Sequence, residues 1–161
     1  MSPSDSVPDP SCFDQGAHED WLLLDRQVCF PLYAASNLVF RAYGPLLKPL
    51  GLTYPQYLIM LLLWQYQELS VGELGQKLHL DSGTLTPLLK RMESAGLVIR
   101  RRSEEDQRRV FVSLTEQGQV LKAEAAMVPA TMACRMGNDL EWLQRLKQDL
   151  GALITTLESA Q

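Results

Sequence analysis

The sequence of 161 residues has few cysteines, no long apolar run and no Lys or Arg near its N-terminus. Three cysteines at wide spacing, Cys12, Cys29 and Cys134, do not form the even-numbered framework of a disulfide-rich secreted protein. The apolar residues 58–64 fall far short of the roughly 20 residues that span a bilayer. The N-terminus also lacks the basic flank and apolar region of a secretion signal. These absences predict a cytoplasmic protein without a membrane-spanning segment, whose thiols are reduced unless they are oxidised for a purpose.

Histidine is scarce as well. His18 and His79, taken with the three cysteines, have no metal-ligand spacing, so we expect no zinc site, and no motif indicates another cofactor. The proportions of hydrophobic residues (46%) and charged residues (21%) are ordinary for a soluble globular protein. Residues 1–19, rich in Pro, Ser and Asp, are predicted to be disordered, and residues 20–161 to form a single domain.

The acidic charge is concentrated at the N-terminus. The first 25 residues contain six acidic residues and no Lys or Arg, so removing them changes the formal net charge from −4 to +2. Between Lys90 and Arg109, by contrast, seven basic residues stand against four acidic ones. A local basic patch matters more to a phosphate backbone than the net charge of the whole chain. The overall charge therefore does not exclude a nucleic-acid partner.

Helix start and stop signals divide the chain into mostly helical segments. A first helix is predicted from about Val28 to about Lys48. Thr53 as N-cap, with Pro55 and Gln56 behind it, opens a second helix that is apolar nearly all round and should lie in the core.

The middle of the chain has the pattern of a helix-turn-helix followed by a hairpin. A capping box at Ser70 opens a short helix to Leu78, and Asp81 or Ser82 caps the next helix, which Gly96 ends. Residues 97–102 and 109–114 are predicted strands, joined by the polar turn 103–108. We therefore predict a mainly α fold in which residues 53–118 form a winged helix-turn-helix with a two-stranded wing.

The C-terminal part is predicted to be helical. Thr115 caps a helix from about residue 116 towards 135, and Asn138 with Glu141 caps a last helix rich in leucine. Those leucines, at near-heptad spacing, are either part of the monomer core or the seam of a dimer. Because a winged helix usually reads two half-sites, we favour a homodimer built from residues 20–50 and 119–161.

The helix after Asp81 is the predicted recognition helix. One side carries an apolar stripe: Leu85, Leu88, Leu89 and Met92. The opposite side carries polar or exposed residues: Ser82, Thr84, Thr86, Pro87, Lys90 and Arg91. Small hydroxyl residues approach bases and phosphates closely, and Lys and Arg reach phosphates or guanine. Pro87 cannot donate to the carbonyl of Gly83, so a kink is possible there. The alternative is an ordinary amphipathic surface helix, but the basic hairpin that follows favours double-stranded DNA as the ligand.

The hairpin tip contains Asp106 and Arg108. An arginine there can enter the minor groove, where the negative potential is concentrated, while Asp106 holds its guanidinium in place. Four further arginines would flank the DNA backbone: Arg100, Arg101, Arg102 and Arg109. The alternative is a charged loop that only keeps the hairpin soluble, and the acidic Glu104 and Glu105 support that alternative.

Five segments between about Trp21 and Gly118 form a recognisable set: residues 24–33, Tyr43, and residues 50–57, 82–91 and 106–108. Together they resemble the MarR family of regulators, and more narrowly its organic-hydroperoxide-sensing repressors of the OhrR type. The specific parts are Asp-x-Gln-x-Cys-Phe, which contains Cys29, and Leu-Thr-Tyr-Pro-Gln-Tyr, which contains Tyr54. The wing alone would indicate only the wider family.

The resemblance implies that Cys29 is the peroxide-reactive thiol and that Tyr43 and Tyr54 hydrogen-bond to it across the dimer. The chemistry fits, because a thiolate attacks the peroxide bond and phenols can donate to an anion. If Pro31 lies in the first helical turn, Cys29 is near a helix N-terminus, which favours an anion. The alternative for Cys29 is a small buried hydrophobic residue, and core packing is the alternative for each tyrosine.

In the two-cysteine members of this group, a cysteine in the C-terminal region resolves the sulfenic acid as an intersubunit disulfide. The resemblance gives that role to Cys134, although no motif surrounds it. Cys12 matches nothing in the family pattern, and we interpret it as a bystander or an adventitious resolver.

The resulting hypothesis is a redox-sensing repressor, not an enzyme, that leaves its operator when an organic hydroperoxide oxidises Cys29. One alternative is a MarR-type regulator that binds a small phenolic or lipophilic ligand, with Cys29 purely structural. Another is a thiol peroxidase, but the companion Thr or Arg arrangement of such enzymes is not recognisable here.

Overall fold

The computed structural model describes residues 22–137 and 139–160, which fall into two compact units. One unit ends at Val39 and contains the short 3-10 helix Leu24–Arg26 and the start of helix α1 (Cys29–Leu47). The other begins at Phe40 and contains the rest of α1 and every later element. The predicted disordered tail, with Cys12 and His18, lies outside the described residues.

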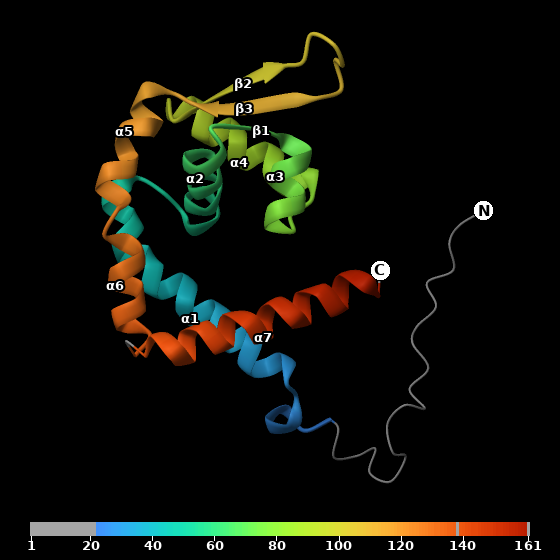
Figure 1. Cartoon of the computed structure of the whole chain (residues 1–161), viewed down its shortest axis with the longest axis vertical. Helices are drawn as coiled ribbons and strands as arrows, with labels where there is room; N and C mark the ends of the chain where they lie inside the picture. The colour runs from blue at the N-terminus through green and yellow to red at the C-terminus, as the bar shows by residue number, and fades with distance from the viewer. Residues whose placement is uncertain (1–21, 138, 161) are drawn as a thin grey trace, which may run out of the picture. The chain divides into compact units, whose positions relative to one another are not determined.

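The second unit is a winged helix-turn-helix, which confirms the predicted fold class (Figure 1). After α1 and a 3-10 turn (Lys48–Leu50), its elements follow in this order: α2 (Tyr54–Tyr66), β1 (Glu68–Ser70), α3 (Val71–Leu78), α4 (Ser82–Ser94), β2 (Val98–Arg102), β3 (Val110–Leu114), α5 (Glu116–Ala125), α6 (Val128–Arg135) and α7 (Leu140–Ser159). Helices α3 and α4 form the helix-turn-helix, and strands β2 and β3 form the wing.

The predicted two-stranded wing is present as β2 and β3, and a third strand, β1, extends the sheet. The strand order is β1-β3-β2, and both pairs are antiparallel. Leu69 of β1 lies opposite Val112 of β3, which itself lies opposite Arg100 of β2. Strand β1 is only three residues long, too short to show the alternation by which a strand is recognised in sequence. It attaches the wing to the segment that enters α3.

The helix starts of α2 and α3 follow the predicted capping residues. Gln56 Oε1 accepts hydrogen bonds from the backbone N–H (2.9 Å) and the hydroxyl (3.0 Å) of Thr53. At α3, Ser70 Oγ accepts from the backbone N–H of Glu73 at 3.2 Å, and Glu73 Oε2 accepts from the Ser70 N–H at 2.7 Å. These bonds satisfy N–H groups that have no partner within the helix. Hydrogen bonds from Ser70 also lower the pKa of the Glu73 carboxyl.

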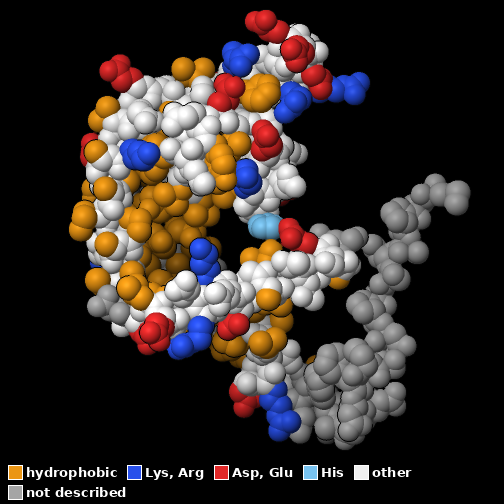
Figure 2. All heavy atoms as spheres, viewed as in Figure 1, with side chains coloured by type: hydrophobic (Ala, Val, Ile, Leu, Met, Phe, Trp, Pro, Cys, Tyr) orange, Lys and Arg blue, Asp and Glu red, His pale blue; other side chains and the backbone are white. Residues whose placement is uncertain are grey.

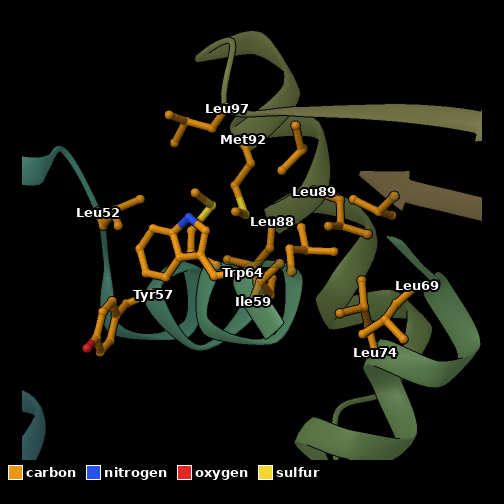
Figure 3. Close-up of a cluster of buried hydrophobic side chains, with 14 of the residues drawn as sticks. Leu52, Tyr57, Ile59, Trp64, Leu69, Leu74, Leu88, Leu89, Met92 and Leu97 are labelled. Carbon is orange, nitrogen blue, oxygen red and sulfur yellow. The ribbon is translucent and has the colours of Figure 1, made fainter. Parts of the chain in front are cut away.

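Helix α2 is the central core helix, as predicted. Ile59, Met60 and Leu63 are fully buried, and Figure 3 shows side chains of α2, α3 and α4 pointing toward one another. Trp64 at the end of α2 packs against Tyr57, with ring centroids 6.4 Å apart. No single helix among the described residues is long and apolar enough to cross a membrane. Cys29–Leu50 and Tyr54–Tyr66 meet that requirement only as a sharply bent pair.

The helix predicted from residue 116 towards 135 is interrupted. Helix α5 ends at Ala125 and α6 begins at Val128, with Pro129 in its first turn. Proline has no backbone N–H, so it cannot donate to the carbonyl of Ala125, and a continuous helix would leave that carbonyl unpaired. Pro129 fits the break, but a proline does not end a helix by itself, because α1 and α4 continue across Pro45 and Pro87.

Helix α7 contributes no buried residue to the described chain. Asp139 caps it, because Asp139 Oδ1 accepts from the backbone N–H of Trp142 at 2.9 Å. The predicted cap, Asn138, lies outside the described residues. The leucines of α7 are half-buried or exposed: Leu140, Leu143, Leu146, Leu150, Leu153 and Leu157. They therefore do not form part of the described core.

Candidate nucleic-acid interface and thiol site

Helix α4 presents the predicted polar face to solvent. The six residues expected on that face are all exposed: Ser82, Thr84, Thr86, Pro87, Lys90 and Arg91. The predicted apolar stripe is buried on the opposite side: Leu85, Leu88, Leu89 and Met92. The helix continues across Pro87 to Ser94, so the lost hydrogen bond to the Gly83 carbonyl does not end it. Gly96, with a φ of +71°, follows the helix in the left-handed conformation that was expected of it.

The N-terminus of α4 is capped by Asp81, not Ser82. Asp81 accepts from the backbone N–H of Thr84 at 2.9 Å and from its hydroxyl at 2.7 Å. These two hydrogen bonds lower the pKa of the Asp81 carboxyl, so it is ionised at neutral pH. The Thr86 hydroxyl donates to the Ser82 carbonyl at 2.7 Å. The hydroxyls of Thr84 and Thr86 therefore both donate their hydrogen bond to a residue of the same helix or its cap. Each can only accept a further hydrogen bond from a ligand.

The tip of the wing is a tight turn closed by Ser103 and Asp106. The backbone N–H of Ser103 donates to the Arg109 carbonyl (2.9 Å), and the Asp106 N–H donates to Ser103 Oγ (3.2 Å). Asp106 Oδ1 accepts from the backbone N–H of Arg108 at 3.0 Å. The Asp106 carboxylate therefore holds the backbone of the turn. The predicted contact between Asp106 and the Arg108 guanidinium is not formed. The Arg108 side chain is exposed at the tip, where Figure 2 shows basic and acidic side chains mixed.

Three other arginines of the wing, Arg100, Arg101 and Arg109, have specific partners. The Arg100 guanidinium donates from Nε (2.9 Å) to Glu93 Oε2, which ties the end of α4 to β2. This contact lowers the pKa of the Glu93 carboxyl. Arg101 and Arg109 lie over the Phe111 ring, at 5.8 and 5.1 Å from its centroid. Arg100 is thus directed inward, whereas Arg101 and Arg109 are held on the exposed face of the wing.

A groove of about 530 Å³ opens between α3, α4 and the wing. Its wall includes Thr86 of α4 and three arginines, Arg100, Arg108 and Arg109, while Leu85 and Leu89 contribute apolar surface. Guanidinium groups beside an open concave surface suit a polyanion. The structure thus brings residues of the recognition helix and the wing to one groove.

Cys29 lies in the unit that ends at Val39. It is the first residue of α1 and is exposed, with Pro31 two residues further on in the first helical turn, as expected. The neighbouring Phe30 and Leu32 are also exposed. The first residue of an α-helix lies among backbone N–H groups without helical partners, and these favour an anion. A small buried hydrophobic residue, the alternative for this position, does not fit its exposure.

Tyr43 and Tyr54 are brought together in the other unit. Their ring centroids are 4.5 Å apart, and Tyr57 and Phe40 complete an aromatic cluster, at 5.9 Å from Tyr43 and 4.9 Å from Tyr54. Burial, together with the nearby Tyr54 and Tyr57, raises the pKa of Tyr43 to about 12. Burial also raises the pKa of Tyr54. Both phenols are therefore protonated donors at neutral pH.

Cys134 lies in the last turn of α6 and is exposed. Among residues 22–137 and 139–160, no three His, Cys, Asp or Glu side chains are grouped as metal ligands would be. Sequence reasoning missed Glu93 and Phe111, which position the arginines of the wing. Glu93 meets Arg100 across a turn and Phe111 meets Arg101 on the neighbouring strand, so no local motif identifies these two contacts, whereas Arg109 is only two residues from Phe111.

Comparison with known proteins identifies relatives over nearly the whole chain. The family model of the SarA/Rot transcriptional regulators matches residues 41–125. The chain is 50% identical over 138 residues to the organic hydroperoxide resistance transcriptional regulator of Bacillus subtilis strain 168. That alignment covers 86% of this chain and 94% of the relative.

Solved structures agree. Reduced AbfR bound to DNA matches with a TM-score of 0.75 and 31% identity, over 86% of this chain and 97% of that one. AbfR, a protein of Staphylococcus epidermidis, also matches in its disulfide form, with a TM-score of 0.61, 34% identity and coverage of 82% and 92%. AbsC, a MarR family regulator from Streptomyces coelicolor, matches with a TM-score of 0.73, 26% identity and coverage of 86% and 98%. With this sequence identity and a winged helix-turn-helix of matching fold, the chain belongs to the MarR family of transcriptional regulators.

Proposed function

We propose that this protein is a DNA-binding transcriptional repressor that leaves its operator when an organic hydroperoxide oxidises Cys29. The observation that carries the proposal is its 50% identity to a regulator of organic hydroperoxide resistance. The exposure of Cys29 at the start of α1 supports a reactive thiol. A deeply buried Cys29 would instead indicate a side chain that only packs in the core.

DNA binding is assigned to α4 and the wing of a homodimer. The exposed polar face of α4 would enter the major groove, and Arg108 at the wing tip would reach the minor groove. Two such heads read half-sites about one helical turn apart, which requires a twofold dimer. The exposed apolar residues of α7, such as Ile154 and Leu157, provide surface for a second copy to cover. That AbfR has been solved on DNA supports this assignment.

The reaction at Cys29 is a displacement on oxygen. The thiolate sulfur attacks one oxygen of the hydroperoxide, and the O–O bond breaks. Sulfur is oxidised to the sulfenic acid, and the leaving alkoxide takes a proton to become an alcohol. The exposed Phe30 and Leu32 beside Cys29 favour an alkyl peroxide over hydrogen peroxide.

The phenols of Tyr43 and Tyr54 are assigned as donors to the thiolate of the other subunit. Tyr43 lies 14 positions after Cys29 in one continuous helix, which is about 21 Å along α1 at 1.5 Å per residue. The Tyr43 phenol therefore does not reach Cys29 of the same chain. Its assigned hydrogen bond goes to Cys29 of a second copy, so this part of the site requires the dimer.

The sulfenic acid would then be captured by Cys134. The Cys134 sulfur attacks the oxidised sulfur on Cys29 of the partner subunit, an S–S bond forms, the S–O bond breaks and water leaves. The disulfide form of AbfR supports such a state in a relative. The cross-link would shift the two reading heads relative to each other. A shift of about 3 kcal/mol between the two arrangements changes DNA affinity more than a hundredfold.

The test is the DNA affinity of wild type, Cys29→Ser and Cys134→Ser before and after treatment with tert-butyl hydroperoxide. The DNA is a duplex selected from a random pool by the reduced protein, and fluorescence anisotropy reports binding. Wild type should bind and then be released, while Cys29→Ser binds equally well and does not respond to peroxide. Release of Cys29→Ser by peroxide would disprove the proposal. If a phenolic ligand without peroxide releases both wild type and Cys29→Ser from the duplex, the ligand-binding alternative is favoured.

A further inference from the structure

Arg135 makes a contact that the proposed function does not use. It is the last residue of α6, and its Nη1 donates to the carbonyl oxygen of Ala42 in α1 at 2.7 Å. A charged donor at this distance makes a stronger hydrogen bond than a neutral one. The contact therefore ties the end of α6 to α1, one residue before Tyr43.

Helix α1 has a gap in its own hydrogen-bond ladder at this point. Pro45 lies inside the helix and has no N–H to donate to the carbonyl of Arg41. The following carbonyl, that of Ala42, is the acceptor for Arg135. The external hydrogen bond thus lies where the helix is internally weakest, and it stabilises the segment that holds Tyr43 in the aromatic cluster.

The two ends of the α5–α6 arm are held in different ways. Gly118 of α5 lies against the Leu97 backbone, and its carbonyl accepts the buried Trp64 Nε1–H at 2.9 Å, so α5 is fixed to the reading head. Met132 is the last buried residue of α6. The turn beyond it carries Cys134 and Arg135, which are both exposed. The hydrogen bond from Arg135 is therefore a surface contact that can open without exposing core.

We propose that Arg135 is a latch that holds the last turn of α6 on α1 in the reduced protein and must release before Cys134 captures the oxidised Cys29. The inference rests on the proposed function. Consecutive Cα atoms are about 3.8 Å apart, so Cys134 moves together with the Arg135 backbone, and a movement that carries this turn away from α1 beyond the reach of the Arg135 side chain breaks the hydrogen bond to Ala42. A disulfide tolerates only a narrow range of Cα–Cα distances, about 4.4–6.8 Å. The turn must therefore follow a partner on another chain, and the latch opposes that movement.

Arg135 should affect the rate at which Cys134 captures the sulfenic acid but not the rate at which Cys29 is oxidised. Oxidation of Cys29 by peroxide does not involve α6, so its rate is independent of Arg135. Capture by Cys134, in which sulfur displaces the sulfenic oxygen as water, requires the latch to open. Removing Arg135 should therefore accelerate capture and leave oxidation unchanged. Arg135 is a positioning residue in this account, and it touches no reacting atom.

The experiment compares wild type, Arg135→Ala, Arg135→Lys and Arg145→Ala, which removes an exposed cation from α7. After tert-butyl hydroperoxide is added, the thiols are alkylated at timed intervals, and a non-reducing gel gives the rate of disulfide formation. In a Cys134→Ser background, a sulfenic-acid probe gives the oxidation rate of Cys29. We expect Arg135→Ala to form the disulfide about fivefold faster, equivalent to about 1 kcal/mol. Arg135→Lys should restore most of the wild-type rate, and Arg145→Ala should match wild type.

An unchanged or slower capture rate in Arg135→Ala would overturn the latch. If wild type forms no disulfide between Cys29 and Cys134, the proposed resolving step is wrong. Whether Arg135 holds the last turn of α6 on α1 is then tested separately, in the reduced protein. Amide hydrogen exchange in the last turn of α6 should be about fivefold faster in Arg135→Ala than in wild type and Arg145→Ala. Equal exchange in the three proteins would also overturn it.

Discussion

Gly118 is the position at which one added methyl group should have the largest effect. A Cβ there would lie 2.2 Å from the Leu97 carbonyl oxygen and 3.2 Å from Leu114 Cδ2. The first distance is roughly 1 Å shorter than a tolerable carbon–oxygen contact, and the clashing atom belongs to the backbone, which cannot rotate away. Gly118→Ala must therefore push α5 away from the start of β2.

The cost follows from what this movement disrupts. Overpacking at a buried site destabilises by about 1–3 kcal/mol. The Gly118 carbonyl also accepts the Trp64 Nε1–H at 2.9 Å, and losing a buried hydrogen bond costs about 1–3 kcal/mol. Both losses come from one displacement, so we expect a decrease of about 2–5 kcal/mol in the free energy of unfolding. That is a large part of the 5–15 kcal/mol that is usual for a domain.

Urea denaturation of the reduced protein at one fixed concentration measures this decrease, because the stability of a dimer depends on concentration. Gly72→Ala is the matched control. Its Cβ would meet only Ser70 Oγ at 4.0 Å, an ordinary contact, and alanine in a helix stabilises by up to about 1 kcal/mol. A Gly118→Ala protein within about 0.5 kcal/mol of wild type would refute the packing argument.

Two further predictions concern DNA affinity and pH. Arg108→Ala should weaken binding to the selected duplex about tenfold, because a wing arginine in a groove contributes about 1–3 kcal/mol. The control Arg145→Ala should leave the DNA affinity unchanged. If Arg108→Ala binds as tightly as wild type, the wing tip is only a charged loop that keeps the hairpin soluble. The pKa of Tyr43 is raised from its ordinary value of 10.0 to about 12 by burial and by Tyr54 and Tyr57. Because the folded state holds this proton more tightly, the resulting stability is complete below pH 10 and is lost as the pH rises toward 12. Tyr43→Phe should reduce the dependence of the urea midpoint on pH between 10 and 11.5, and an undiminished slope would contradict the assignment.

The helix-turn-helix could be predicted from sequence because its signals are local. The capping pairs Thr53–Gln56 and Ser70–Glu73 join residues three apart, so propensity and hydrogen bonding agree before any tertiary contact forms. The buried stripe of α4 follows in the same way from helical periodicity. The break between α5 and α6 lies beside Pro129, but a proline alone does not predict a break, because α1 and α4 continue across Pro45 and Pro87.

The candidate thiol site was predicted by resemblance rather than by local pattern. Nothing in the spacing of Cys29 and Tyr43 relates them, because they lie about 21 Å apart along one helix. Exposure of Cys29 and burial of the tyrosines are properties of the folded chain. The same holds for β1, whose three residues become a strand only because β3 offers them hydrogen-bond partners.

The sequence by itself determined the helices, their caps, the wing and the polar face of α4, because each depends on residues within a turn or two of one another. Tertiary structure alone decided which arginines face solvent, since Arg100 is held by Glu93 across a turn while Arg101 and Arg109 lie over Phe111. It also decided that Gly118 of α5 packs against the Leu97 backbone and that Arg135 donates a hydrogen bond to Ala42 of α1. The contacts of Gly118 with Leu97 and of Arg135 with Ala42 join residues 21 and 93 positions apart, and only chain folding brings such residues together.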